Sequence, residues 1–302
     1  MVEHVQNINN AVVTLDVALP GIIWGWMITL NMWAKSIATG VVLVGGYLFF
    51  RYKDEKGGVP GIKTIIPIVA FIFLNIFLLF TLLDLHQPFR MINIFLHPHF
   101  TSAITVGAWM ASALTGIIAY MSFLVVVKKN TTGLYETLLK WAIFLSVPVT
   151  MYTAVIMGQA SARELWQTPA ELIQMMLAAF LVGSATLAFF SPKWSKEAKR
   201  DLAIILGMSA FLSFTIYMGE YFLSWKLAEA EATMAYVHSG GEYNMLFWAG
   251  QIIGFILPAI FSFMATRNGS APLLQIAAIL SIIGLYMAKH VWLVIPQLLS
   301  LS

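Results

Sequence analysis

Residues 62–102 read IKTIIPIVAFIFLNIFLLFTLLDLHQPFRMINIFLHPHFTS. The first half of this stretch is an almost unbroken apolar run that ends at Asp84, and a polar segment rich in proline and histidine follows it. A helix needs about 20 apolar residues to cross a bilayer, and the run from 62 to 83 supplies them. The stretch therefore predicts a membrane-spanning helix that ends in a short turn outside the bilayer.

The composition of the whole chain extends this prediction. The 302 residues are 60% hydrophobic and 10% charged, whereas soluble domains carry about 25% charged residues. We therefore expect an all-α integral membrane protein, a single transmembrane domain over residues 1–302 with both termini on one side. The expected spans are 18–50, 62–83, 101–127, 135–158, 169–190, 201–225, 244–266 and 271–297. The first is too long for one straight span, so we expect it to tilt or to protrude.

Lysine and arginine are distributed unevenly between alternate loops. The loops after the first, third, fifth and seventh spans hold 12 of them, and the opposite loops hold Arg90, Arg163 and Lys226. Because basic loops remain in the cytoplasm, this bias orients the bundle. In a cytoplasmic (inner) membrane, both termini and the 84–100 loop would face the periplasm. Acidic residues gather at the same outer ends, namely Asp84, Glu164, Glu171, Glu220, Glu229, Glu231 and Glu242.

The first span contains an ionisable residue, Lys35, within the sequence LNMWAKSIATG. An ionisable group inside a span costs at least about 2.5 kcal/mol, so it suggests a functional site. Asn31 lies four residues earlier on the same helical face. The two side chains would offer an ammonium and a carboxamide to a ligand inside the bundle. The alternative is that Lys35 pairs with Glu171 or Glu220 and only holds helices together.

The fourth span carries a second polar stripe. Tyr152, Ile156, Gln159 and Arg163 follow one another at spacings of 4, 3 and 4, which would place them on one helical face. This pattern favours a binding surface. The alternative is that Tyr152 belongs to an aromatic belt and that the guanidinium of Arg163 extends to the interface. For Lys289, in the last span, we expect the ammonium to extend to the interface.

The polar segment after the second span has its own predicted role. Pro88 prevents the helix from continuing, and an ion pair between Asp84 and Arg90 would fix the turn. The histidines His86, His97 and His99 give only a weak metal signal, and we expect no metal site.

Missing residue types restrict the cofactors. The chain has no cysteine, so it cannot ligate an iron–sulfur cluster through thiolates. Haem in a membrane anchor needs histidines from the spans, and only His290 lies clearly inside one. Neither haem nor an iron–sulfur cluster is therefore expected in this chain.

Three motifs together resemble the polysulfide reductase membrane-subunit family (NrfD/PsrC). DLHQPFR followed by a tract ending in TS is similar to the family's Asp-Leu-Gly-Arg-Pro…Arg element, with His86 and Gln87 in place of Gly-Arg. GWMITLNMWAKSIATG resembles its first helix, and YTAVIMGQASARELWQTP its fourth helix and the following turn. The resemblance covers nearly the whole chain and agrees with the expected number of spans.

The resemblance implies a function. Such subunits anchor a respiratory redox complex and exchange electrons with the membrane quinone pool, menaquinone or ubiquinone. A ferredoxin-like subunit with [4Fe-4S] clusters docks on one face and leads to a molybdopterin or multihaem cytochrome subunit. The family's quinone site, carried over, falls on Asn31 and Tyr152, with Lys35 beside them. The 84–100 loop, with Asp84, His86, Pro88 and Arg90, would then be a docking surface.

Within this function the remaining polar residues take expected roles. Gln159 and Arg163 would extend the quinone site, and Asp84, Glu171 or Glu220 would relay protons to or from the outside. Besides quinone, membrane lipid is an expected contact and nucleic acid is not. Two other functions stay open. One is a secondary transporter, which often shows inverted repeats that this sequence lacks, and the other is a structural anchor without a quinone.

Overall fold

The structure is a computed structural model that describes residues 21–55, 57–85, 87–127, 132–223 and 228–299. Every regular element in these ranges is helical, which confirms the all-α prediction. Within them, eight helices are long and apolar enough to cross a membrane. They are α3 (Trp26–Arg51), α4 (Ile62–Asp84), α6 (Ala103–Val127), α7 (Thr132–Gly158), α8 (Thr168–Ala188), α9 (Lys196–Leu223), the composite Asn244–Asn268, and α13 (Ala271–Val294).

The composite span contains a local irregularity. It consists of α11 (Asn244–Gln251), a π-helix η5 (Ile252–Ile256) and α12 (Leu257–Asn268). A π-helical turn widens the helix by one residue and often accompanies a functional site. Here it brings Gly254 against the backbone of Gly284 in α13, where a Cβ on Gly284 would lie 2.1 Å from the Cα of Gly254.

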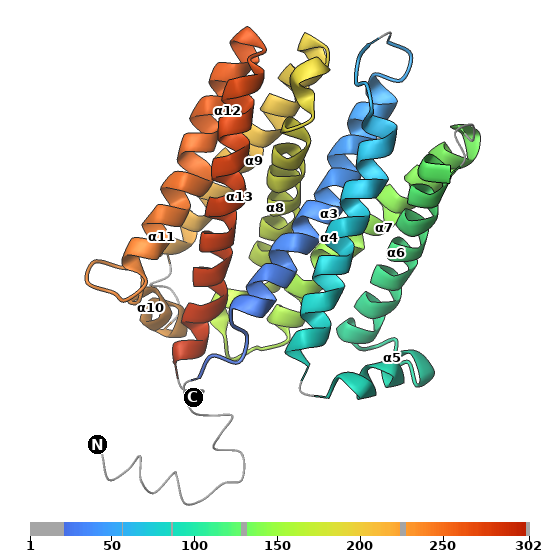
Figure 1. Cartoon of the computed structure of the whole chain (residues 1–302). Coiled ribbons are helices and arrows are strands. Elements are labelled where there is room, and N and C mark those ends of the chain that lie inside the picture. Colours follow the sequence, from blue (N-terminus) through green and yellow to red (C-terminus); the bar gives the residue numbers. More distant parts are fainter. Residues whose placement is uncertain (1–20, 56, 86, 128–131, 224–227, 300–302) are drawn as a thin grey trace, which may run out of the picture.

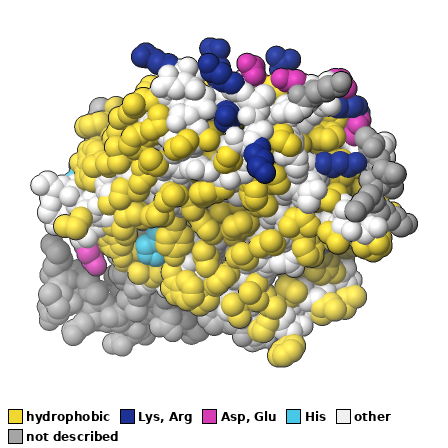
Figure 2. All heavy atoms as spheres, turned by 45° about the horizontal axis from the view of Figure 1, so that its top comes forward, with side chains coloured by type: hydrophobic (Ala, Val, Ile, Leu, Met, Phe, Trp, Pro, Cys, Tyr) yellow, Lys and Arg dark blue, Asp and Glu magenta, His cyan; other side chains and the backbone are white. Residues whose placement is uncertain are grey.

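Short elements lie at the two ends of the bundle (Figure 1). At the end where α4 finishes are η1 (Pro88–Ile92), α5 (Asn93–Leu96), η2 (Glu164–Trp166), α10 (Ala228–Met234) and η6 (Ile295–Leu298). At the opposite end is η3 (Ser191–Lys193). Figure 2 shows lysine and arginine side chains gathered at this opposite end, above a broad apolar belt. We call it the basic end, and it is the end that the loop bias predicts to be cytoplasmic.

Helix α3 is central to the packing and contacts α4, α7, α8 and α13. Glycines allow the closest of these contacts. A Cβ on Gly40 would lie 1.9 Å from the carbonyl oxygen of Ala179, and one on Gly183 would lie 2.3 Å from the carbonyl carbon of Gly40. This confirms the close helix–helix approach that small residues typically provide in membranes. It fixes α3 against α8, and both helices carry buried charged residues.

The first span begins later than predicted. Helix α3 starts at Trp26, and residues 21–25 are not helical, while 18–20 lie outside the described residues. Gln297 explains the arrangement, because its Oε1 accepts the backbone N–H groups of Ile23 and Trp24, both at 2.9 Å. Its Nε2 donates to the carbonyl oxygen of Trp24 at 3.0 Å. Residues 21–25, which the prediction included in the first span, therefore form a non-helical segment that Gln297 holds against the end of the last helix. We call this segment the strap.

Replacing Gln297 with leucine should release this strap. The variant leaves the two backbone N–H groups without their acceptor, which costs about 1–3 kcal/mol each when such groups stay buried. We expect faster proteolysis near residues 21–25 and a lower melting temperature. Limited proteolysis and thermal unfolding measure both effects, and Gln167→Leu, at an exposed glutamine, is the control. Equal proteolysis of wild type and Gln297→Leu would contradict the assigned role.

Candidate functional site: buried polar groups between the helices

Lys35 lies in the interior of the bundle. Its side chain is fully buried, and its Nζ donates a hydrogen bond to the hydroxyl of Thr153 on α7. The same ammonium lies 4.4 Å from the centroid of the Tyr152 ring. The structure thus brings together Lys35 and Tyr152, the residues that the sequence placed in the first and fourth spans.

Gly107 of α6 makes room for the Tyr152 ring. A Cβ on Gly107 would lie 2.4 Å from the Cδ2 of Tyr152. The ring is therefore held between the ammonium of Lys35 and the backbone of α6. A cation over an aromatic face contributes about 0.5–2 kcal/mol, more when desolvated. This is small beside the cost of burying an unpaired charge.

Lys35 is not neutralised by a carboxylate. Among the described residues, the ion pairs within 4.0 Å are Lys53–Glu136 and Arg163–Glu229. The alternative in which Lys35 pairs with Glu171 or Glu220 is therefore not observed. The buried amine is instead a hydrogen-bond donor to the hydroxyl of Thr153, beside the ring of Tyr152.

Asn31 lies one turn from Lys35 but faces α4. Its Nδ2 donates to the carbonyl oxygen of Phe77 at 3.0 Å and to the hydroxyl of Thr81 at 2.5 Å. Both amide hydrogens are thus used to hold α3 against α4. A ligand would find only the carboxamide oxygen of Asn31 available, which is an acceptor.

A second polar group lies between α8, α9 and α13. Glu171 is buried, and its Oε1 accepts the indole N–H of Trp292 at 2.7 Å. The Tyr217 ring meets that of Trp292 edge-on, with centroids 4.9 Å apart. Glu220, three residues after Tyr217 on α9, is half-buried and interacts electrostatically with Glu171. The structure therefore brings together the two carboxylates that the sequence proposed as proton carriers.

Lys289 belongs to this second group, and its predicted position was wrong. Its side chain is only 4% exposed, and its Nζ donates to the Sδ of Met175 at 3.2 Å. The end of the last span was predicted correctly, since α13 and η6 together extend to Leu298. The contact with α8, which hydropathy does not reveal, is what buries Lys289. Its ammonium therefore cannot reach the interface. A charged residue inside a span was the signal in the sequence.

Lys289 links the two groups. It interacts electrostatically with Lys35 on one side and with Glu171 on the other. Lys289 and Trp292 are one turn apart on α13, and Met175 and Glu171 are one turn apart on α8. The contact between Lys289 and Met175 therefore lies next to the contact between Trp292 and Glu171. The ionisable groups thus follow one another from α3 through α13 to α8 and α9.

The predicted stripe on the fourth span does not persist. Helix α7 ends at Gly158, which packs against Thr168 so closely that a Cβ would lie 1.8 Å from its hydroxyl oxygen. Gln159 is exposed in the following turn and Arg163 lies in the loop. The prediction of one helical face through residue 163 was therefore wrong, because it assumed that the helix continued.

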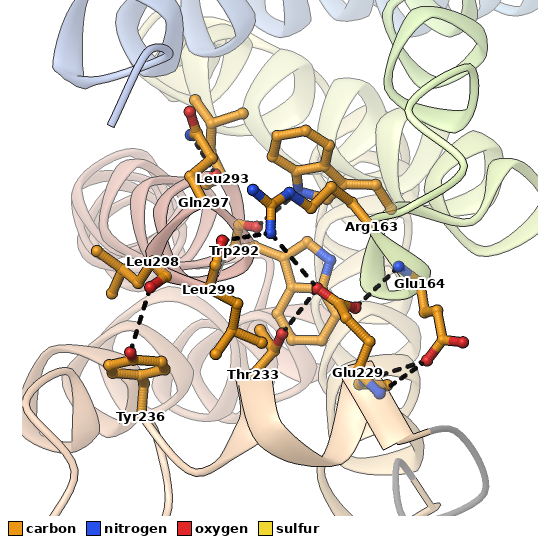
Figure 3. A network of polar contacts seen from close by, with 12 residues as sticks. Arg163, Glu164, Glu229, Thr233, Tyr236, Trp292, Leu293, Gln297, Leu298 and Leu299 are labelled. Carbon is orange, nitrogen blue, oxygen red and sulfur yellow. Dashed lines mark hydrogen bonds and ion pairs between the residues drawn. The ribbon is translucent and has the colours of Figure 1, made fainter. Parts of the chain in front are cut away.

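Arg163 takes part in a network at the outer end of the bundle (Figure 3). Its guanidinium donates to the carbonyl oxygen of Leu299 at 2.8 Å and lies 3.9 Å from the carboxylate of Glu229. Glu229 accepts the backbone N–H of Glu164 at 2.9 Å, and Glu164 accepts that of Glu229 at 3.1 Å. Burial lowers the pKa of Arg163, and burial raises the pKa of Glu229. The network ties three segments together.

The turn after α4 differs in one respect from its prediction. Pro88 opens η1 as expected, but Arg90 is exposed. No ion pair joins Asp84 to Arg90 among the described residues, so the predicted pair is not observed, and Asp84 is engaged in another interaction. His86 lies outside the described residues. His97 and His99 are exposed, and no group of three acidic or histidine side chains in the described ranges is placed to hold a metal.

The fold and these groups define the class: a multi-pass helical membrane protein with ionisable side chains buried between its helices. The family model "Polysulphide reductase, NrfD" matches residues 17–299, nearly the whole chain, and the chain belongs to this family. The resemblance drawn from its motifs is thereby confirmed. A place as the membrane subunit of a respiratory oxidoreductase complex is consistent with this membership. No curated protein matches the chain.

Proposed function

We propose that this chain is the quinone-binding membrane subunit of a multi-subunit respiratory oxidoreductase. It exchanges electrons between the membrane quinone pool and an iron–sulfur partner subunit. The observation that carries the proposal is the position of Lys35, fully buried against Tyr152 and Thr153, with no carboxylate partner among the residues that the structure describes. An amine in this environment is a donor for an oxygen that gains electron density.

The chain's residues would bind the head group and handle its protons. A quinone supplies two-electron, two-proton chemistry when bound, while the protein supplies position and electrostatics. The Nζ of Lys35 and the phenol of Tyr152 would donate hydrogen bonds to a carbonyl oxygen of the head group. The apolar surroundings exclude water, which strengthens both interactions.

Protons would move through the second polar group. Lys289 lies between Lys35 and Glu171, and Glu220 beside Glu171 is half-buried near the outer end of α9. In this proposal Glu171 and Glu220 carry protons between the site and the outer side, and Asp84 serves the outer end of α4. Electrons would pass directly between the quinone and the nearest cluster of the partner.

A binding titration tests the site. A fluorescent quinol-site inhibitor would be titrated into the purified complex as wild type, Lys35→Ala and Tyr152→Phe. We expect saturable binding to wild type and about tenfold weaker binding to Lys35→Ala, since a charge-assisted hydrogen bond contributes about 1.5–3 kcal/mol. Tyr152→Phe keeps the ring and should weaken binding less.

The outcomes separate the alternatives. If wild-type complex with its iron–sulfur partner does not bind the inhibitor, the quinone proposal is refuted and the structural anchor is favoured. If binding is unchanged in both variants, the quinone lies elsewhere and the site assignment is wrong.

The segment from Pro88 to Phe100 supports a docking role. It lies beyond the end of α4, and it exposes Phe89 by 95%, Leu96 by 63% and Phe100 by 65%. In the proposed complex, a ferredoxin-like [4Fe-4S] subunit covers these apolar side chains and leads to a molybdopterin or multihaem cytochrome subunit. An acidic outer rim suits a partner with a basic patch.

Cysteine labelling tests the orientation. Because the natural chain has no cysteine, single cysteines can be introduced without other changes. His97→Cys should react with a membrane-impermeant maleimide in intact spheroplasts, since the outer surface is then accessible. Arg267→Cys, at the basic end, should react only after permeabilisation. The reverse pattern would invert the topology and rule out docking on the outer side.

A further inference from the structure

A cavity of about 260 Å³ lies at the basic end, between the end of α3 and the start of α4. Its lining includes two aromatic residues, Phe49 and Tyr52, which we call the aromatic wall. The other lining residues are Lys53, Glu55 and residues 57–63. This cavity is at the opposite end from Pro88–Phe100. None of the proposed quinone-site residues lines it.

The loop that forms the cavity is held in one shape. Gly57 and Gly61 have φ values of +80° and +82°, which favour glycine. The carbonyl oxygen of Gly58 accepts the N–H of Ser195 at 2.9 Å, and that of Pro60 accepts the indole N–H of Trp194 at 3.2 Å. Contacts with the α8–α9 connection thus turn these two carbonyl groups toward that connection.

Hydrogen-bond donors remain at the cavity. In the described part of the chain, the backbone N–H groups of Gly61 and Lys63 have no hydrogen-bond partner. Beneath Lys63 lies Tyr135, with the lysine Nζ 5.2 Å from the ring centroid, and Tyr135 also packs edge-on against Phe49. The hydroxyl of Tyr135 is fully buried and has no partner among the described residues. The two backbone donors therefore belong to residues that line the cavity, whereas Tyr135 lies behind Lys63 and does not line it.

The charges at the cavity are not equivalent. Lys53 is already paired with Glu136 at 2.9 Å, and Glu55 is exposed. Lys63, by contrast, contacts no carboxylate within 4.0 Å in the described ranges. Of the two described lysines that line the cavity, Lys63 is therefore the one without a carboxylate partner, next to the uncapped first turn of α4, where the helix dipole also favours an anion.

We propose that this cavity binds the phosphate of an anionic phospholipid. Lys63 and the free amides at the start of α4 would hold the phosphate. The cavity lies at the ends of two helices that are long and apolar enough to span a membrane, where we expect the lipid head groups. Basic pockets between helices on this side of a membrane commonly bind anionic lipid head groups. The aromatic wall of Phe49 and Tyr52 would contact the glycerol backbone.

Native mass spectrometry of the purified complex tests the proposal. Phosphatidylglycerol would be titrated into wild type, Lys63→Ala, Lys63→Arg and Arg267→Ala, with phosphatidylcholine as the neutral lipid. We expect Lys63→Ala to weaken phosphatidylglycerol binding at least fivefold, and Lys63→Arg and Arg267→Ala to retain it. Arg267 is an exposed cation at the same end that does not line the cavity, so it controls for general charge.

Each outcome decides the matter. Equal binding by Lys63→Ala and Arg267→Ala would overturn the site, as would equal affinity of wild type for the neutral lipid. Inorganic phosphate is the third ligand, and its binding is measured by the shift in melting temperature. Stabilisation by millimolar phosphate that Lys63→Ala abolishes, without preference for the lipid, would overturn the lipid assignment. Melting temperatures of all variants show whether they fold.

Discussion

Replacing Lys35 with methionine is expected to lower quinol-linked electron transfer about 100-fold, the lower end of what removing one preorganised donor costs. Methionine has a similar length and fills the same space, so packing between α3 and α7 is kept. The variant loses the donor to Thr153 and the cation over Tyr152. Because a buried polar amine without a carboxylate partner among the described residues is replaced by an apolar side chain, the thermal stability should be equal to or higher than that of wild type.

Steady-state quinol oxidation by the purified complex measures the effect, together with the partner subunit's own activity with an artificial electron donor. The partner subunit's activity with the artificial electron donor should be unchanged. Lys140→Met is the matched control, because Lys140 is exposed near the basic end of α7. Normal quinol turnover in Lys35→Met would show that the buried amine serves structure alone.

Gly40→Leu is expected to give the largest loss of stability. A Cβ at this position would already lie 1.9 Å from the carbonyl oxygen of Ala179, so α3 and α8 would have to separate. Overpacking of a well-packed core costs about 1–3 kcal/mol and occasionally more, and backbone atoms cannot move aside as a flexible side chain can. We expect a loss of about 3 kcal/mol or more and poor yields of the complex.

Thermal unfolding monitored by size-exclusion chromatography checks this prediction. The matched control is Gly116→Ala in α6, where a Cβ would meet nothing within 4 Å. That change should be neutral or slightly stabilising, since alanine is favoured over glycine in a helix by about 0.5–1 kcal/mol. A Gly40→Leu variant as stable as wild type would mean that α3 and α8 do not cross at this point.

Much of the fold was predictable because the bilayer imposes a strong physical constraint. Apolar runs of about 20 residues identify spans without any knowledge of their packing. Helix α4 was expected over 62–83 and extends over Ile62–Asp84. The first span was less well bounded, because hydropathy does not distinguish a helix from the apolar strap that Gln297 holds.

The candidate site was predictable only in part. Lys35 and Tyr152 were identified because a charge inside a span is costly and a motif pointed to the same helices. The prediction that Gln159 and Arg163 continue one helical face with Tyr152 was wrong, since α7 ends at Gly158. The prediction for Lys289 was wrong for another reason: whether a lysine reaches the interface depends on the side chains that surround it, here those of α8.

The sequence by itself determined that this is a membrane protein, how many spans it has, its family and the burial of Lys35. These properties follow from local composition and spacing, because the cost of desolvating polar groups keeps most of them out of membrane spans. Only the tertiary structure decided the partners of the buried ionisable groups: Lys35 with Thr153 and Tyr152, and Glu171 with Trp292. Such contacts depend on how helices rotate and cross, and glycine contacts such as Gly40 with Gly183 set those crossings.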